Sequence, residues 1–258
     1  MQKTLLDIIL AAGEKMLGFD QLKVYQKEGH ANFVTQADLG VQAFLMEELK
    51  KAAPEAVFFA EEKENEALTD AATFMIDPID GTTNFMRGRK CSSISVALLQ
   101  NREPVLAAIL NPYTKELFHA EKGKGAFLNG QPIHVSGQDF QGALVSMGTS
   151  PYDAALAGKT MKAAEKFLLA AGDLRRTGSA AIDLCDVACG RSDIYWELIL
   201  SPWDFAAGAL IVKEAGGMIV SPGRGPLHFD QKTPVLAANP ICFDKAEEIL
   251  VGVLSSEQ

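Results

Sequence analysis

The sequence predicts an α+β fold, and three observations lead to that prediction. The 258 residues are 48% hydrophobic and 22% charged, which is the composition of an ordinary globular protein. The first half shows helical periodicity followed by short apolar segments separated by turns such as Asn129-Gly130. The second half alternates helical and strand-like patterns. Two sheets covered by layers of helices would satisfy all three observations.

The elements of the first half follow from periodicity and capping residues. Apolar side chains recur at helical spacing near the N-terminus, at Leu5, Ile8, Ile9, Ala12 and Met16. Thr35 followed by Asp38 marks the start of a second helix that runs to about Lys51. Strands are expected at 58–62, 74–76, 93–99, 105–110, 116–120 and 144–147, the second ending at Asp77-Pro78. The first half is therefore predicted to place two helices on a mostly antiparallel sheet.

The second half is predicted to contain four helices and three strands. The helices are expected at about 154–170, 179–189, 204–215 and 244–254, and the strands at 193–196, 218–220 and 235–238. No repeat, low-complexity tract or long linker interrupts the pattern. We expect one domain, 1–258, with sub-domains of about 1–145 and 146–258.

Charge and cysteine content exclude several classes of protein. The net charge of −9 argues against a nucleic-acid binder or a membrane-surface protein, both of which need clustered Lys and Arg. No apolar run approaches the roughly 20 residues of a membrane span, and Asp7 interrupts the N-terminal apolar stretch. Cys185 and Cys189 suit one helix face, so we interpret the four cysteines as reduced thiols, with zinc as a minor alternative. The expected compartment is the cytoplasm.

The segment 77–85 contains the residues best suited to catalysis. Asp77 and Asp80 are expected on a turn that points both carboxylates the same way, where the Ile79 carbonyl would add another oxygen ligand for a hard cation such as Mg²⁺. A helix starting near Gly81 and Thr82 would direct N–H groups at a phosphate. The structural alternative is that Asp-Pro and Asp-Gly are common turn dipeptides.

The string Asp77-Pro78-Ile79-Asp80-Gly81-Thr82-Thr83-Asn84-Phe85 closely resembles the signature of the inositol monophosphatase family of Mg²⁺-dependent phosphatases. Three other segments resemble parts of the family pattern, namely the acids after strand 58–60, the stretch 176–181, and the stretch 203–217. The resemblance spans about residues 27–217. It implies a layered αβαβα sandwich of the inositol monophosphatase and fructose-1,6-bisphosphatase type.

The resemblance also implies roles for individual residues. Metal ligands would be Glu61, Asp77, the Ile79 carbonyl, Asp80 and Asp204, holding two or three Mg²⁺ ions with Asp77 bridging. Asp204 is also expected to cap the helix that follows it. Catalysis would involve Glu61 and a water-orienting pair in which Thr82 bonds to Asp38. Lys27 aligns with a lysine on the family's mobile loop. Substrate would contact Asp80, Gly81, Thr82, Thr149, Ala180, Glu197 and Asp204.

The function implied is hydrolysis of inositol monophosphate, or of a similar small sugar phosphate, by a water that the metal activates. The family further implies inhibition by Li⁺ and a homodimer. Two alternatives stay open. Arg87, Arg89 and Lys90 would favour a second phosphate, which suggests fructose 1,6-bisphosphatase or a dual enzyme. A regulatory protein that kept the fold without the chemistry is the alternative from another class.

Overall fold

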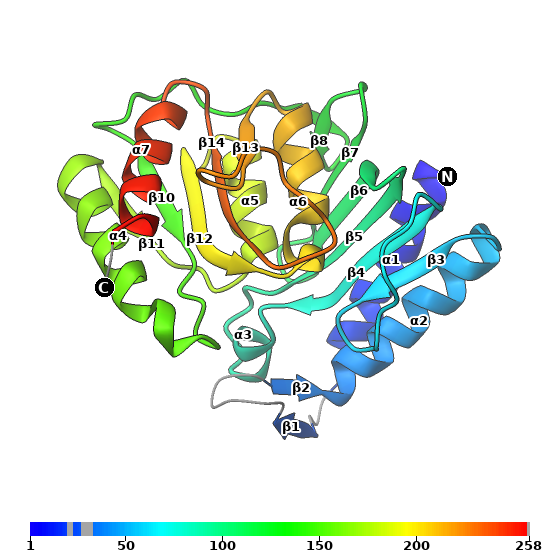
Figure 1. Cartoon of the computed structure of the whole chain (residues 1–258). Coiled ribbons are helices and arrows are strands. Elements are labelled where there is room, and N and C mark those ends of the chain that lie inside the picture. Colours follow the sequence, from blue (N-terminus) through cyan, green and yellow to red (C-terminus); the bar gives the residue numbers. More distant parts are fainter. Residues whose placement is uncertain (20–22, 27–32, 257–258) are drawn as a thin grey trace.

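The chain folds into two sheets that are separated and flanked by helices (Figure 1). The computed structural model describes residues 1–19, 23–26 and 33–256. The helices are α1 Gln2–Leu17, α2 Gln36–Ala52, α3 Thr82–Met86, α4 Ala157–Ala170, α5 Ala180–Ala188, α6 Pro202–Glu214 and α7 Phe243–Leu254, with a short 3₁₀ helix η1 at Ala154–Leu156.

The strands of the described residues form two large sheets and one two-stranded ribbon. The seven-stranded sheet follows the order β3 Val57–Ala60, β4 Thr73–Asp80, β5 Ser93–Gln100, β6 Glu103–Asn111, β7 Glu116–Glu121, β8 Ala126–Leu128 and β9 Gln131–Ile133. All its neighbours are antiparallel except β3 and β4. The five-stranded sheet follows the order β11 Asp173–Arg175, β10 Leu144–Met147, β12 Ile194–Leu200, β14 Thr233–Ala238 and β13 Met218–Val220. β1 Val24–Gln26 and β2 Phe33–Thr35 form a two-stranded ribbon.

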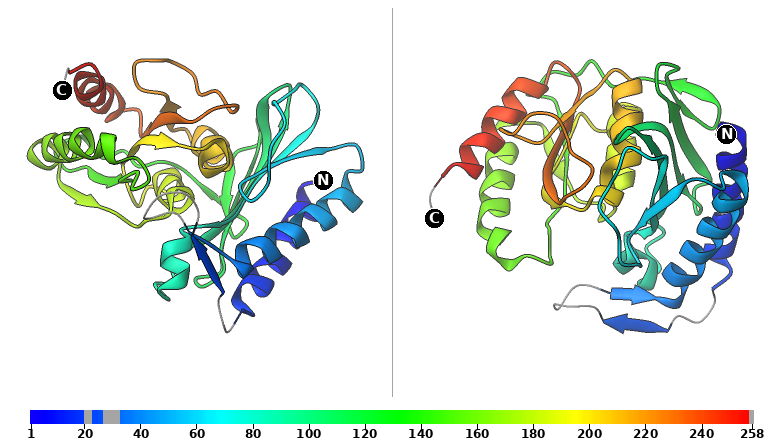
Figure 2. Two further views of the ribbon diagram at one scale, coloured as in Figure 1. Left: turned by 60° about the horizontal axis from the view of Figure 1, so that its bottom comes forward. Right: turned by 45° about the vertical axis from the view of Figure 1, so that its right-hand side comes forward.

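Five layers result, as Figures 1 and 2 show. Helices α1 and α2 pack on the outer face of the seven-stranded sheet, α5 and α6 lie between the two sheets, and α4 and α7 cover the five-stranded sheet. Three buried hydrophobic clusters fill the spaces between these layers. The predicted αβαβα sandwich is therefore confirmed.

Strand alternation decides which residues face the middle helices. In β4, Phe74 and Ile76 join the cluster under α1 and α2, whereas Met75 joins the cluster around α5 and α6. In β12, Tyr195 faces the middle layer and Trp196 faces α4 and α7. Both sheets are covered on both faces, which explains why their strands read as continuous apolar runs.

The structure corrects the predicted elements at two functional places. The strand that was expected to end at Asp77-Pro78 continues to Asp80. The helix expected from Asp204 begins at Pro202, with Ser201 as its N-cap. Asp204 is instead the third helical residue, and its carboxylate accepts the backbone N–H of Ser201 at 2.8 Å. The N-cap therefore lies three residues before the predicted one, and Asp204 contributes to capping as the N3 residue of a capping box.

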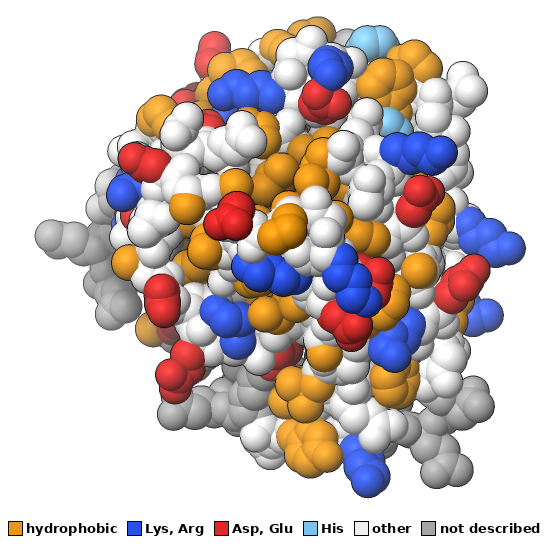
Figure 3. Space-filling view, turned by 90° about the vertical axis from the view of Figure 1, so that its right-hand side faces the viewer, with side chains coloured by type: hydrophobic (Ala, Val, Ile, Leu, Met, Phe, Trp, Pro, Cys, Tyr) orange, Lys and Arg blue, Asp and Glu red, His pale blue; other side chains and the backbone are white. Residues whose placement is uncertain are grey.

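Two further observations bear on what the surface can bind. Among the described residues, no helix is both long and apolar enough to cross a membrane. On the face in Figure 3, acidic and basic side chains are interspersed rather than gathered by sign. Exposed ion pairs such as Lys51 with Glu47 and Glu48 show this mixing within a single helix.

Candidate active site

A β-bulge places the two aspartates of β4 on one face of the sheet. Asp77 pairs with Ser95 and Asp80 pairs with Ser93, so three steps along β4 match two steps along β5. Paired residues of antiparallel strands share a face, and residues two apart in one strand share it too. The extra residue therefore turns Asp80 to the side on which Asp77 lies. The expected turn does not exist, but the carboxylates still point to the same side.

Asp77 lies at the centre of a concentration of negative charge. Its side chain is 2% exposed, and one carboxylate oxygen accepts the backbone N–H of Ile79 at 3.0 Å. Burial raises the pKa of Asp77 well above its usual value, and Glu61, Asp80 and Asp204 raise it further. These acids come from the end of β3, the bulge of β4 and the first turn of α6, so three separate segments meet here.

The same group of negative charges acts on Asp204. Burial raises its pKa, the charges of Glu61 and Asp80 add to that effect, and the backbone bond from Ser201 opposes it. The main charges acting on Asp77 and Asp204 are thus negative, which is the electrostatic condition for binding cations.

Asp80 joins the two halves of the molecule. One of its oxygens accepts the backbone N–H of Ala181 at 2.7 Å and the hydroxyl of Ser179, and the other accepts the N–H of Ala180 at 3.3 Å. These donors form the N-terminus of α5, whose N-cap is Ser179. Burial raises the pKa of Asp80 to about 6, while its hydrogen bonds to Ser179, Ala181 and Ala180 act in the opposite direction. The backbone predicted to meet substrate at Ala180 thus meets Asp80 in this structure.

Thr82 and Asp38 are in contact. The Thr82 hydroxyl lies 3.1 Å from Asp38 Oδ1 and 3.1 Å from the carbonyl oxygen of Ile79. Asp38 Oδ2 accepts the backbone N–H of Thr35 at 2.8 Å, and the Thr35 hydroxyl also donates to it. Burial raises the pKa of Asp38, and these bonds oppose the shift. The capping box of α2 therefore orients the carboxylate that faces Thr82.

Gly81 is required by the close approach of two loops. Its φ is +85°, and an added Cβ would lie 3.1 Å from the carbonyl oxygens of both Cys91 and Gly178. Only glycine fits this left-handed conformation without displacing backbone. Next to it, Asn84 donates to the carbonyl of Thr177 at 3.0 Å, a second link between the halves.

Glu197 forms a separate wall of the site. Its carboxylate accepts the backbone N–H of Ser150 at 2.7 Å and the hydroxyl of Tyr195 at 2.9 Å. Burial raises its pKa, while these bonds and the charge of Arg176 lower it. Arg176 also donates to the hydroxyl of Thr149 at 3.3 Å, so Thr149 and Glu197 lie near the same cation.

Tyr152, which the sequence analysis did not name, lies close enough to the acids to be affected by their charges. The residue is 65% exposed. The pKa of its hydroxyl is raised, first by the surrounding protein and then by the charges of Asp204, Glu61 and Glu197. A loop of small and polar residues that ends in an aromatic, directly after the strand at 144–147, is the signal that could have identified it.

The side chains at this site suit a divalent cation such as Mg²⁺ in their chemistry. They offer hard oxygen donors, and the negative charges among them outnumber the positive ones. Ser95, opposite Asp77, adds a buried hydroxyl without a hydrogen-bond partner among the described atoms. No three His, Cys, Asp or Glu side chains within the described ranges are already close enough together to hold an ion. Within the described ranges, the acids therefore influence one another's pKa without forming a closed cage of three such side chains.

The remaining predicted residues lie outside this cluster or outside the described chain. Lys27 falls in the segment 27–32, which lies outside the described residues. Arg87, Arg89 and Lys90 are exposed in the loop that follows α3. All four cysteines are free thiols, with Cys185 and Cys242 buried.

Known proteins share both this sequence and this fold. The sequence profile of the inositol monophosphatase family matches residues 2–254. The chain belongs to the inositol monophosphatase family. Inositol monophosphatase 3 of Solanum lycopersicum is 38% identical over 229 residues, covering 84% of this chain and 85% of that protein.

Two bacterial members of the family match over nearly the whole chain. The Nus factor SuhB of Xylella fastidiosa (strain Temecula1) is 36% identical over 266 residues, covering 98% of this chain and 96% of that protein. The solved structure of the extragenic suppressor protein suhB from Bartonella henselae superposes with a TM-score of 0.88 and 32% identity, covering 96% of this chain and 97% of that chain. The resemblance drawn from the sequence is confirmed, and the chain is a phosphatase of the inositol monophosphatase family.

Proposed function

We propose that this member of the inositol monophosphatase family hydrolyses myo-inositol 1-phosphate, or a closely similar small sugar phosphate, with Mg²⁺ as cofactor. One observation carries the proposal. Carboxylates from three segments of the chain raise one another's pKa beside the bulge of β4. Relatives named inositol monophosphatase, such as the Synechocystis protein at 38% identity, support the substrate class. Inhibition by Li⁺ and a homodimer belong to the same proposal.

The proposed roles follow from position. Glu61, Asp77, Asp80, Asp204 and the Ile79 carbonyl would hold the ions. When bound, Mg²⁺ supplies positive charge for the phosphoryl oxygens and for the attacking water. The Thr82 hydroxyl donates to Asp38 Oδ1, the oxygen that does not bond to Thr35, and would position that water. Gly81 would contact the substrate through its backbone, while Thr149, Ala180 and Glu197 would form the wall that faces the hydroxyl groups of the substrate.

The substitution Asp77→Asn tests the proposal. It keeps the oxygen that accepts the Ile79 N–H while removing one charge from the cluster. We expect phosphate release from inositol 1-phosphate to fall at least about 100-fold, the scale of losing one group that stabilises the transition state. We also expect Mg²⁺ to raise the melting temperature less than in the wild type. The metal-free variant should be more stable than the metal-free wild type, because it lacks one repelling charge.

Asp70→Asn is the matched control. Asp70 carries the same group, but it is exposed and pairs with Arg102 away from the cluster. It should leave turnover and the response to Mg²⁺ unchanged. Wild-type turnover in Asp77→Asn, or an equal loss in Asp70→Asn, would remove the basis for the site assignment.

Fructose 1,6-bisphosphate is the second candidate substrate. The three cations of the loop after α3 are exposed, and that helix starts at Gly81 beside the bulge. Replacing Arg87, Arg89 and Lys90 together with Gln should raise KM for fructose 1,6-bisphosphate about tenfold or more if the loop binds a second phosphate. KM for inositol 1-phosphate should stay constant. Equal effects on both substrates, or none on either, would argue against a bisphosphate role.

A regulatory role beside catalysis is the alternative from another class, because two relatives carry the name Nus factor SuhB. As a sole function it conflicts with the retention of every acid of the family pattern. The turnover of the purified protein with Mg²⁺ separates the two cases.

A further inference from the structure

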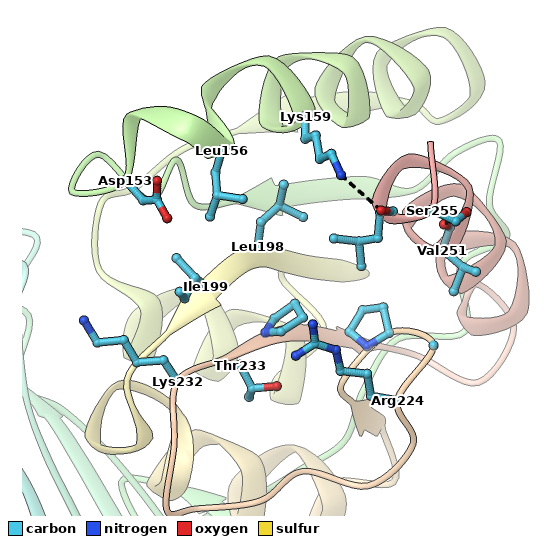
Figure 4. A pocket seen from close by; sticks show the side chains of 14 residues that line it. Asp153, Leu156, Lys159, Leu198, Ile199, Arg224, Lys232, Thr233, Val251 and Ser255 are labelled. Atoms are coloured by element: carbon cyan, nitrogen blue, oxygen red, sulfur yellow. Dashed lines mark hydrogen bonds between the residues drawn. The ribbon is translucent and has the colours of Figure 1, made fainter. Parts of the chain in front are cut away.

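A cavity of about 490 Å³ lies behind one wall of the proposed active site (Figure 4). Its sides are η1 and the start of α4, the end of β12, the loop between β13 and β14, and the end of α7. Leu198 lines the cavity, whereas its neighbour Glu197 is held by Ser150 on the other side of the strand. The cavity is therefore distinct from the carboxylate cluster.

The lining of the cavity combines an apolar body with positive charge. The apolar side chains are Leu156, Leu198, Ile199, Pro222, Pro234, Val251 and Leu254. Lys159, Arg224 and Lys232 supply three cations against the single acid Asp153, in a chain whose net charge is −9. The lining of the cavity is therefore positively charged, although the whole molecule is negatively charged.

Two of the cations have no acidic partner in the part of the chain that the structure describes. Lys159 is engaged, because its ammonium donates to the carbonyl of Leu254 at 3.1 Å and ties α4 to α7. Neither Arg224 nor Lys232 forms an ion pair with any described residue. In Figure 4 both come from the loop side, below Leu198 and Ile199, and the Arg224 guanidinium points toward the middle of the pocket, whereas the Lys232 side chain points away from Arg224.

The loop that carries Arg224 is held in place before any ligand arrives. The hydroxyls of Ser221 and Thr233 are 2.8 Å apart at its base, and the Arg224 N–H donates to the Ser221 carbonyl at 2.9 Å. The N–H of Gly223 reaches Glu247 of α7 at 3.4 Å. The walls are thus preformed, so a ligand need not order them.

We propose that this cavity binds a small organic anion: a carboxylate, sulfonate or phosphate group attached to an apolar body. The anionic group would meet Arg224, with Lys232 adding positive charge from the same loop side, and the apolar body would fill the space beside Leu156, Leu198 and Val251. The proposal concerns a second site and is independent of the phosphatase function.

The test is a fluorescence titration with 8-anilinonaphthalene-1-sulfonate, which carries one sulfonate on an aromatic body. No Mg²⁺ or phosphate ester is present. We expect saturable binding of one equivalent by the wild type. R224Q/K232Q should weaken it at least about tenfold, because each lost hydrogen bond to a charged group weakens binding by roughly that factor. S255W should abolish binding by filling the cavity from the end of α7 without changing its charge.

The matched control is R102Q/K245Q, which removes two cations from surface ion pairs elsewhere. It should bind the probe like the wild type. The proposal is overturned if the wild type does not bind, if R224Q/K232Q and S255W bind as tightly as the wild type, or if the control weakens binding equally. Circular dichroism of each variant confirms that it is folded.

Discussion

Asp38 shows how one side chain serves both a helix and a reaction centre. Its Oδ2 completes the capping box with Thr35, which leaves Oδ1 directed at Thr82. A carboxylate with three donors stays ionised more readily than burial alone would allow. The orientation proposed for the attacking water is therefore already determined at the first turn of α2.

Replacing Thr82 separates these roles. Thr82→Val removes the hydroxyl, and we expect kcat to fall about 100-fold or more, the scale of losing a positioned proton acceptor or donor. It also leaves a buried acceptor unpaired, which costs about 1–3 kcal/mol of stability. Thr82→Ser keeps the hydroxyl and should restore most of kcat. If Thr82→Val loses stability but retains kcat, Thr82 is structural only.

Gly148 is a second residue at which adding one atom, a Cβ, would disturb the site. An added Cβ would lie 1.8 Å from Glu197 Oε2, so the buried carboxylate would have to leave Ser150 or Tyr195. Gly148→Ala should cost about 1–3 kcal/mol, as overpacking usually does, and should raise KM. Thermal unfolding and steady-state kinetics measure the two effects.

Gly158 provides the control for that substitution. It lies in α4 with no atom within 4 Å of an added Cβ. Gly158→Ala should stabilise the protein by roughly 0.5–1 kcal/mol through helix propensity. Equal behaviour of the two alanine variants would show that Glu197 is not confined as described.

At the scale of elements, the sequence predicted what periodicity can encode. The six long helices and the long strands appear within a few residues of their expected bounds. The strands β1, β2, β8, β9 and β11 have three residues each, too few to show a period, and were not predicted. The equally short β13 was predicted at 218–220, because the Gly216-Gly217 turn marks the residue before it. The bulge at Asp77–Asp80 was also missed, because register depends on β5 and not on the segment itself.

The site could be predicted as a set of residues but not as an arrangement. The motif at 77–85 contains the two acids and Thr82, yet nothing local indicates that Asp80 meets a helix 100 residues later in the chain. Tyr152 and Ser150 escaped for the same reason, since their relation to Glu197 exists only after β10 and β12 pair.

For the whole molecule, most of the net negative charge falls in one stretch of the sequence. Residues 36–85 contain eleven Asp and Glu against three Lys, a net charge of −8 out of the total of −9, and Glu61, Asp77 and Asp80 of the site belong to this stretch. Without cations the acids of the site repel one another, and burial disfavours the ionised forms of Asp77, Asp80 and Asp204. The surplus is a cost of folding that a bound cation would remove.

Stability should therefore depend on pH in a definite direction. Asp77, Asp80 and Asp204 have pKa values raised above 3.8, that of Asp80 to about 6, so the folded protein binds more protons than the unfolded one. Their contribution is present below about pH 4 and is lost as pH rises above it, that of Asp80 as pH passes about 6. In EDTA, the melting temperature of the wild type relative to Asp77→Asn should fall as pH rises above 3.8, since the pKa of Asp77 is raised from that value. Saturating Mg²⁺ should raise the melting temperature and flatten the difference.

Carboxylates such as Glu116, whose pKa is lowered by Arg191, make stability rise with pH instead. They are present in both the wild type and Asp77→Asn, so the difference between the two melting temperatures cancels their effect. A difference that is flat in EDTA, or a melting temperature indifferent to Mg²⁺, would contradict the repulsion inferred here.

The position of Asp80 has a mechanical consequence. Its backbone belongs to the seven-stranded sheet, but its carboxylate is gripped by the first turn of a helix from the other half. With the bond of Asn84 to Thr177 and those of Gly123 and Gly125 to Glu214, these bonds connect the two halves. Since the same carboxylate is a proposed ion ligand, ion binding would change the cohesion of the halves, and that cohesion would change the affinity for the ion by the same free energy.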